Sequence, residues 1–151
     1  PLLDVWDDGI GWEELSFTSP VDMPITGAYG SHISLDDGKQ ISRNSGIDIT
    51  APEGTEVLSP NAGRVLFAAR LKLTGYTVVI EHGGGLKSFY YHLDDITINQ
   101  GGMVERGTPI GTVGDTGTDE PPHLTMEMKI GNQSIDPVPL FRGVSAIYRK
   151  N

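Results

Sequence analysis

The sequence predicts a single all-β domain, a compact antiparallel β-sandwich or barrel-like fold. Its 151 residues include 20 glycines and 10 prolines, which interrupt regular structure and favour many short elements joined by tight turns. With 37% hydrophobic and 21% charged residues, the chain can fill one core and rarely two. We therefore expect short strands packed around one core.

The first 19 residues are acidic, and their large apolar side chains follow neither strand nor helix spacing. We interpret residues 1–19 as an N-terminal extension whose aromatic side chains, Trp6, Trp12 and Phe17, pack onto the domain. An exposed patch that binds a partner is the alternative interpretation.

The domain itself is expected to occupy residues 20–141, with a C-terminal tail at residues 142–151. His32 is interpreted as polar surface. The Asp-Asp-Gly-Lys sequence within residues 35–42 indicates a hairpin tip or a loop.

Two short apolar strands are predicted next, at residues 47–49 and 57–58, separated by a loop that contains proline and glycine. Successive side chains of a strand point to opposite faces. Ile47 and Ile49 should therefore face one side of the sheet and Asp48 the other.

Three longer strands complete the predicted sheet. Residues 76–82 are dense in β-branched side chains, glycines 83–85 form a turn, and residues 89–93 return as the hairpin partner. Glycines within residues 96–114 separate very short strands. Residues 123–130 alternate cleanly, so that the polar face of this last strand carries His123, Thr125 and Glu127.

Charge and composition exclude several classes of function. The net charge of −9 argues against nucleic-acid binding, which needs clustered lysine and arginine. The absence of cysteine excludes disulfides and thiolate metal sites. The sequence has no run of eighteen apolar residues, so we expect no membrane contact within this fragment. Because the chain opens without methionine, we expect any signal peptide or anchor to lie upstream.

Two short sequences suggest a family: Asn-Ser-Gly-Ile-Asp at residues 44–48 and His-Leu-Thr at residues 123–125. They resemble the metal-binding segments of the lysostaphin/LytM-type zinc endopeptidases, which cut peptide cross-links in bacterial cell walls. The family's segments read His-x-Gly-x-Asp and His-x-His. Tyr-Tyr-His-Leu at residues 90–93 and Asp-Pro at residues 136–137 extend the resemblance over residues 20–141. The resemblance implies that residues 20–31 form the entry strand of the domain.

The resemblance implies where zinc would bind and what this chain has lost. An active member holds zinc with two imidazoles and one carboxylate, and a bound water attacks the peptide bond. Here Asn44 and Thr125 replace the imidazoles, and only Asp48 is retained. An amide and a hydroxyl do not ordinarily bind zinc, so we expect no cofactor. His92 and His123 match the family's catalytic positions and are expected to be vestigial.

These substitutions predict a catalytically degenerate LytM-type domain. The floor of its groove is expected to hold five side chains, Asn44, Asp48, His92, His123 and Thr125. Degenerate members of the family include activators of cell-wall amidases and the stage II sporulation protein Q type. The resemblance therefore implies an extracytoplasmic binding or regulatory module in cell-wall remodelling or sporulation, whose partner is peptidoglycan or a cell-envelope protein such as an amidase.

Other functions fit parts of the sequence. An active zinc endopeptidase that cleaves cross-link peptides is the main alternative, and Asp48, His92 and His123 have the residue types that a rearranged zinc site would need. A module that binds only peptidoglycan is a third hypothesis. Biotinyl, lipoyl and phosphocarrier domains share the glycine rhythm of residues 96–114, but Lys72 is better interpreted as an ordinary strand-end lysine.

Overall fold

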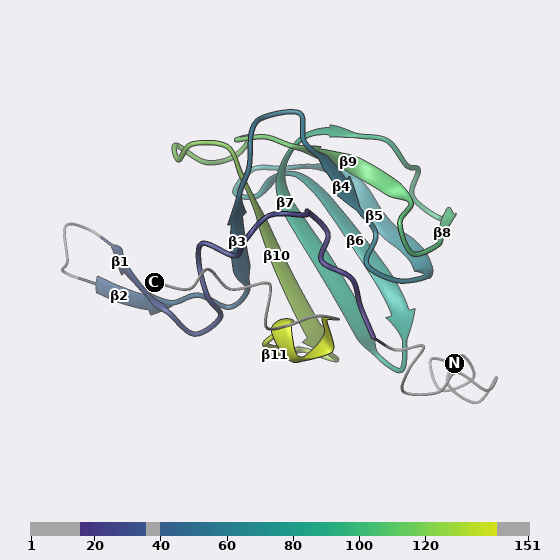
Figure 1. The fold of residues 1–151 in the computed structure, drawn as a ribbon, viewed down its shortest axis with the longest axis horizontal. Helices are drawn as coiled ribbons and strands as arrows, with labels where there is room; N and C mark the ends of the chain where they lie inside the picture. The colour runs from purple at the N-terminus through teal and green to yellow at the C-terminus, as the bar shows by residue number, and fades with distance from the viewer. Residues whose placement is uncertain (1–15, 36–39, 142–151) are drawn as a thin grey trace.

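The computed structural model describes residues 16–35 and 40–141, which form an antiparallel all-β domain (Figure 1). Within these residues nine strands belong to one sheet, and two further strands make a small separate sheet. Every strand pair is antiparallel. The predicted fold class is therefore confirmed, and the large sheet is bent but not closed into a barrel.

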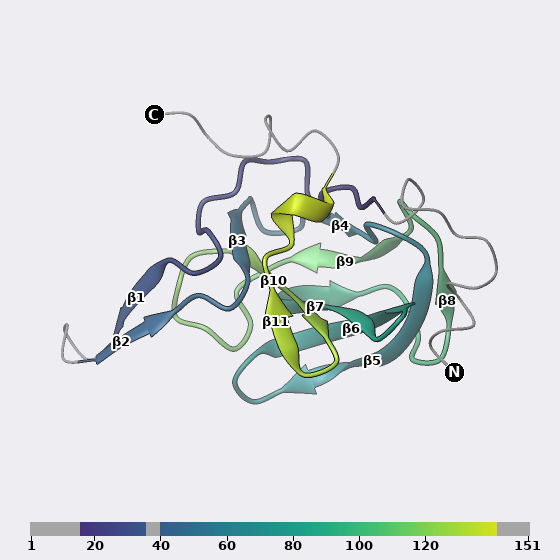
Figure 2. The same cartoon turned by 90° about the horizontal axis from the view of Figure 1, so that it is seen from below.

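The elements are β1 (His32–Leu35), β2 (Gln40–Arg43), β3 (Ile47–Thr50), β4 (Glu56–Leu58), β5 (Gly63–Leu71), β6 (Gly75–Gly83), β7 (Leu86–Ile96), β8 (Met103–Val104), β9 (Pro109–Val113), β10 (His123–Ile130), β11 (Gln133–Ile135) and the 3-10 helix η1 (Val138–Leu140). The main path through the large sheet is β11-β10-β7-β6-β5-β8. β3 branches from β10, β9 from β7, and β4 pairs with β9. Figure 2 shows β4 and β9 lying to one side of β5, β6 and β7.

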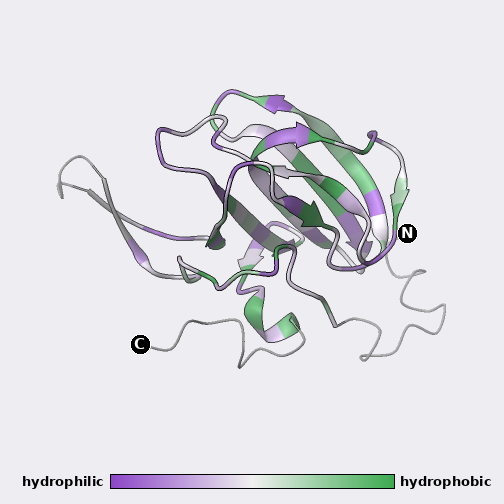
Figure 3. Ribbon diagram, turned by 45° about the horizontal axis from the view of Figure 1, so that its top comes forward, coloured by the Kyte–Doolittle hydropathy of each residue, from purple (hydrophilic) through white to green (hydrophobic). Residues whose placement is uncertain are grey.

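Alternation along the strands fills the core as the sequence predicts. Ile47 and Ile49 of β3 are 0% exposed, and so are Leu124, Met126 and Met128 of β10. The residues between them are half-buried or exposed, apart from buried His123. Figure 3 shows the resulting hydrophobic and hydrophilic bands along the strands.

The hairpin of β6 and β7 also forms as predicted. Gly84 and Gly85 make its turn with φ values of 62° and 80°, a backbone conformation that favours glycine. β1 and β2 pair as a second hairpin on either side of residues 36–39, which lie outside the described residues.

Phe17 belongs to the core. It is 1% exposed and forms an isolated bridge with Phe141. The interpretation that aromatic side chains of the N-terminal segment pack onto the domain is therefore confirmed for Phe17. Trp6, Trp12 and the predicted tail at residues 142–151 lie outside the described residues.

The predicted entry strand at residues 20–31 is wrong. This segment is irregular and joins the sheet through isolated bridges, one of which pairs Gly27 with Asp48. Pro20 and Pro24 supply no N–H to a strand ladder, which prevents continuous pairing here. In the part of the chain that the structure describes, no helix has the length and apolar character needed to cross a membrane.

Candidate functional site

The pairing of β3 with β10 brings the two predicted motif segments together. Its register places Asp48 opposite Thr125 and Thr50 opposite His123. Because Ile47 and Ile49 face the core, the pleat directs Asp48 to the other face of β3. Residues that are 77 positions apart in the chain therefore share one site.

Asn44, Asp48 and Thr125 form one hydrogen-bonded network. Nδ2 of Asn44 donates to Oδ2 of Asp48 at 3.0 Å, and the hydroxyl of Thr125 donates to Oδ1 at 2.7 Å. The backbone N–H of Gly46 donates to Oδ1 of Asn44 at 3.1 Å, which fixes the orientation of the amide. Both oxygens of the Asp48 carboxylate thus accept a hydrogen from a neutral side chain.

Gly27 gives the carboxylate its space. A Cβ atom at this position would lie 2.5 Å from Oδ2 of Asp48, closer than non-bonded atoms allow. The backbone N–H of Asp48 donates to the carbonyl oxygen of Gly27 at 2.9 Å. The irregular segment that replaces the predicted entry strand therefore forms one wall of the site.

His92 on β7 and His123 on β10 lie side by side, with ring centroids 5.1 Å apart. Nδ1 of His92 donates to the carbonyl oxygen of Thr116, and Nδ1 of His123 to that of Pro121, both at 2.8 Å. A carbonyl oxygen can only accept, so each neutral ring keeps Nε2 as its acceptor. Nε2 of His123 lies 3.7 Å from Oε2 of Glu120.

The environment of His92 favours its neutral form. Burial lowers the pKa of His92, the hydrogen bond to Thr116 raises it, and the charge of a protonated His123 would lower it further. The net direction is downward from the ordinary value of 6.5. At neutral pH His92 is therefore an uncharged hydrogen-bonding group.

The backbone of His92 is unusual. Its φ is 64°, in the left-handed region that residues other than glycine rarely adopt. The N–H of His92 donates to the carbonyl oxygen of Thr74 at 2.8 Å, and the pairing of β7 with both β6 and β9 is irregular next to this residue. These contacts hold the imidazole beside His123.

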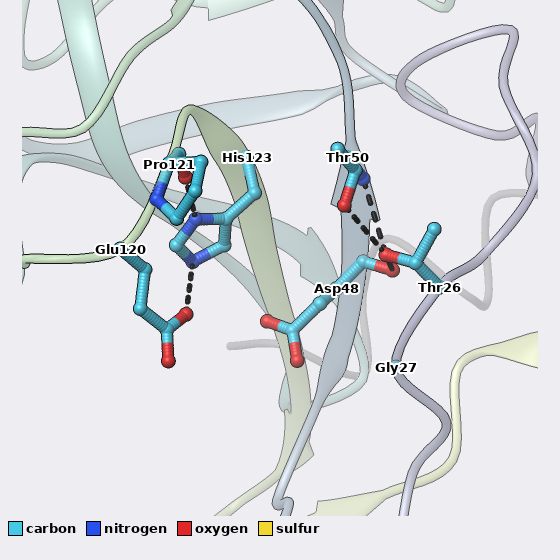
Figure 4. A pocket seen from close by; sticks show the side chains of 7 residues that line it. All are labelled: Thr26, Gly27, Asp48, Thr50, Glu120, Pro121 and His123. Carbon is cyan, nitrogen blue, oxygen red and sulfur yellow. Dashed lines mark hydrogen bonds and ion pairs between the residues drawn. The ribbon is translucent and has the colours of Figure 1, made fainter.

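A pocket of about 320 Å³ opens beside Asp48 (Figure 4). Its lining residues are Thr26, Gly27, Asp48, Thr50, Glu120, Pro121 and His123. Of the five predicted groove residues, the pocket includes Asp48 and His123 but not Asn44, His92 or Thr125. Asn44 is 7% exposed, which places it beneath the carboxylate instead of on an open floor.

The sequence reasoning missed most of this lining. Glu120 and Pro121 directly precede the His-Leu-Thr segment, so their position in the chain could have indicated them. Thr26 reaches the pocket only through tertiary contacts, because its hydroxyl lies 3.0 Å from that of Thr50 and its N–H donates to the carbonyl oxygen of Asp48. No spacing in the sequence marks that relationship.

The neighbours of Asp48 present hydrogens to its carboxylate. The atom of Asn44 that faces the carboxylate is its amide nitrogen, which has no lone pair to share with a cation. Thr125 presents its hydroxyl hydrogen to the same carboxylate. Among the residues that the structure describes, no group of three or more His, Cys, Asp or Glu side chains is placed to hold a metal ion.

Two other histidines lie outside this site. His82 on β6 is buried, with Nδ1 2.8 Å from the carbonyl oxygen of Ala62 and Nε2 2.7 Å from Oγ of Ser88. Burial lowers the pKa of His82 to about 4, although the hydrogen bond to Ala62 opposes this shift. His32 is exposed on the small β1–β2 sheet. Neither side chain contacts the Asp48 network.

Comparisons with known proteins match the chain to one family. The family description "Peptidase family M23" matches residues 42–137. The peptidoglycan DD-endopeptidase ShyB of Vibrio cholerae is 36% identical over 74 residues, which are 49% of this chain and 17% of ShyB. The murein hydrolase activator EnvC of Escherichia coli is 36% identical over 77 residues, which are 51% of this chain and 18% of EnvC. The chain thus spans only a small part of the curated relatives that it matches.

Solved structures show the same fold. A zinc-containing peptidase from Vibrio cholerae superimposes with a TM-score of 0.76 and 31% identity, covering 82% of this chain and 40% of that chain. The SpoIIQ–SpoIIIAH pore-forming complex gives a TM-score of 0.74 at 20% identity, covering 85% of this chain and 92% of the matched chain. The second likeness concerns the fold alone.

Proposed function

The chain belongs to peptidase family M23, and we propose that it is a catalytically inactive member of the family that binds or regulates a component of the bacterial cell envelope. The observation that carries the proposal is the state of Asp48, whose two oxygens accept hydrogens from Asn44 and Thr125. Neutral donors stabilise this carboxylate where a peptidase of the family would use a cation, and that cation is needed to activate water.

The histidine pair does not supply a substitute mechanism. Hydrolysis without a metal-bound water needs a general base that activates either a nucleophilic side chain or a free water molecule, together with a group that stabilises the oxyanion. The chain has no cysteine, and Nδ1 of His92 and of His123 is taken by a backbone carbonyl. Without a cation to polarise the attacking water or the scissile carbonyl, we propose that the two basic Nε2 atoms are not sufficient for hydrolysis.

A regulatory role is supported by the kinds of relative that the chain has. One is a murein hydrolase activator, and the fold is also that of SpoIIQ, which is described in a complex with SpoIIIAH. We propose that the partner is peptidoglycan or a cell-envelope protein, such as a wall amidase or a sporulation protein, and that the domain acts outside the cytoplasm.

Metal content and hydrolysis test the loss of catalysis. Protein purified without chelators would be analysed for zinc by mass spectrometry and incubated with peptidoglycan, with the products separated by chromatography. We expect far less than one zinc per chain and no cleavage, and D48A should match the unmodified protein in both. D115A, which removes an exposed carboxylate, is the control. Stoichiometric zinc that only D48A loses, together with cleavage, would contradict the proposal.

Amidase activation and wall binding test the regulatory role. The domain would be added to a purified cell-wall amidase with dye-labelled peptidoglycan, and dye release would be measured. Faster release supports an activator. Cosedimentation with peptidoglycan without any change in amidase rate would identify a wall-binding module. If the domain neither accelerates dye release nor cosediments with peptidoglycan, the regulatory proposal is wrong for this partner class.

An active endopeptidase with atypical ligands is the second candidate. The observation that favours it is that Asp48, Glu120 and His123 line one pocket. This candidate requires the hydrogen bonds from Asn44 and Thr125 to Asp48 to open before a cation could bind. The zinc measurement above separates the two functions.

A further inference from the structure

We propose that the free edge of β5 binds an extended acidic segment of a partner protein by strand addition. β5 lies between β6 and the short strand β8. β8 pairs with Gly63 and Arg64 of β5. Val65, the next residue, exchanges backbone hydrogen bonds with residues 101–102 and is the last residue of β5 that is paired on this side. Beyond that point, residues 66–71 have β6 on one side and no strand on the other among the described residues. In Figure 2 this part of β5 forms the lower margin of the sheet.

The edge carries an unusual share of the exposed apolar surface. Six large hydrophobic side chains are exposed in the described residues, and four of them lie along this edge, its hairpin or adjoining β8. They are Leu66 at 36%, Leu71 at 44%, Leu73 at 80% and Met103 at 69% exposure. Exposed apolar side chains on an unpaired strand favour pairing with a further strand.

The charge of the edge selects the partner. Residues 63–75 contain Arg64, Arg70 and Lys72 and no acidic residue, although the whole chain has a net charge of −9. None of these three cations forms an ion pair with a carboxylate in the part of the chain that the structure describes. The guanidinium of Arg70 lies 5.3 Å from the ring centroid of Tyr76. A local basic patch on an acidic protein attracts an acidic partner.

These features argue against a second copy of the chain as the occupant. Basic side chains on an edge strand oppose pairing between identical edges, because pairing would bring the like charges of Arg70 and Lys72 from two copies onto one short interface. An extended acidic segment avoids this repulsion. Its backbone would satisfy the free edge, and its alternate apolar side chains would cover the exposed leucines.

The surface is separate from the candidate site. β6 and β7 lie between β5 and β10, so the edge and the Asp48 pocket are on different parts of the sheet. The inference does not depend on whether the pocket binds a metal or hydrolyses peptides.

Hydrogen exchange of the whole chain tests the inference. The probe is a nine-residue acetylated and amidated peptide that alternates valine and glutamate, and its matched control has lysine in place of glutamate. We expect the glutamate peptide to slow exchange in residues 66–71 and not in β10. It should bind about tenfold more tightly than the lysine peptide, since each exposed ion pair contributes modestly. Its affinity should fall as salt is added.

Charge reversal supplies the second test. R70E/K72E should weaken binding of the glutamate peptide about tenfold or more, whereas K87E/K129E, which makes the same change of charge on β7 and β10, should not. Circular dichroism would confirm that both variants fold. If either does not, the two peptides on the unmodified protein decide the matter. The inference would be overturned if residues 66–71 gained no protection or if both peptides bound equally. It would also be overturned if protection rose with protein concentration in the absence of peptide, because a second copy of the chain would then be the occupant.

Discussion

Thr125 on β10 donates its hydroxyl hydrogen to Oδ1 of Asp48 on β3 at 2.7 Å. Asn44 donates to the other oxygen at 3.0 Å, so one carboxylate joins two strands and the loop before β3. The two residues that we propose stand in place of the family's zinc ligands are thus the two that donate to the carboxylate of Asp48. We therefore expect both the metal affinity and the stability of the domain to depend on the same three side chains.

Replacing Asn44 and Thr125 together by histidine should create a zinc site. N44H/T125H would restore two imidazoles beside the Asp48 carboxylate. Loss of an outer-shell partner lowers metal affinity about 10- to 100-fold, and loss of a ligand lowers it further. Each single variant should therefore bind zinc at least about 10- to 100-fold more weakly than the double variant. Competition with a coloured chelator at neutral pH would measure all three affinities.

The control for this experiment is N44H/T112H, which adds the same two imidazoles but places one on β9, away from Asp48. Imidazole must be neutral to bind zinc, so the affinity of N44H/T125H should decrease as the pH falls below about 6.5. If N44H/T125H binds zinc no more tightly than N44H/T112H, the backbone around Asp48 has also lost the family's geometry.

Removing the Thr125 hydroxyl should destabilise the domain. T125V keeps the shape of the side chain but leaves one oxygen of Asp48 without its donor. A hydrogen bond to a charged group contributes about 1.5–3 kcal/mol, and because Asp48 and Thr125 are only half-buried we expect a loss of about 1–2 kcal/mol. Urea unfolding would measure it. T125S retains the hydroxyl and should lose less, and a T125V variant as stable as the unmodified protein would show that this hydrogen bond does not stabilise the domain.

The strands could be predicted where alternation and turn residues agree. β10 begins at His123 and ends at Ile130, because its alternating side chains meet a core on one face and end at the turn of Gly131. The entry strand could not be predicted correctly. Its pairing depends on how Gly27 meets Asp48, which is a contact between segments distant in the chain.

The site could be predicted in composition but not in geometry. Two short motifs indicated that Asn44, Asp48 and Thr125 belong together. The direction of the Asn44 amide depends on the N–H of Gly46, and the left-handed backbone of His92 depends on its contact with Thr74. Neither is encoded by residue type alone, because each follows from backbone positions that only the folded chain defines.

The pH dependence of stability should report on His82. Burial lowers its pKa to about 4 in the folded chain, whereas an unfolded histidine titrates near 6.5. Between these values the unfolded chain binds a proton that the folded chain does not, so the free energy of unfolding decreases as the pH falls from about 6.5 to about 4. The stability contributed by neutral His82 is fully present above about pH 6.5, and the loss of stability reaches about 3 kcal/mol near pH 4.

Urea unfolding between pH 4.5 and 7 would isolate this effect by comparison with H82Q. The difference in stability between the unmodified protein and H82Q should shrink as the pH falls, since the variant has no proton to bind at this position. H32Q, which makes the same substitution at an exposed histidine on β1, is the control variant for this comparison. Parallel curves for H82Q and the unmodified protein would show that His82 does not stay neutral in the folded chain.

The left-handed backbone of His92 should reverse the usual order of alanine and glycine. H92A and H92G both remove the imidazole and its bond to Thr116, but at a φ of 64° alanine is disfavoured by about 1–2 kcal/mol and glycine is not. H92G should therefore be about 1 kcal/mol more stable than H92A in urea unfolding. Lys87 lies on the same strand, and its φ is not positive. There the alanine variant K87A should instead be more stable than K87G by about 0.5–1 kcal/mol in the free energy of unfolding. An H92A variant as stable as H92G would mean that the backbone of β7 at this position relaxes in solution, and with it the placement of His92 beside His123.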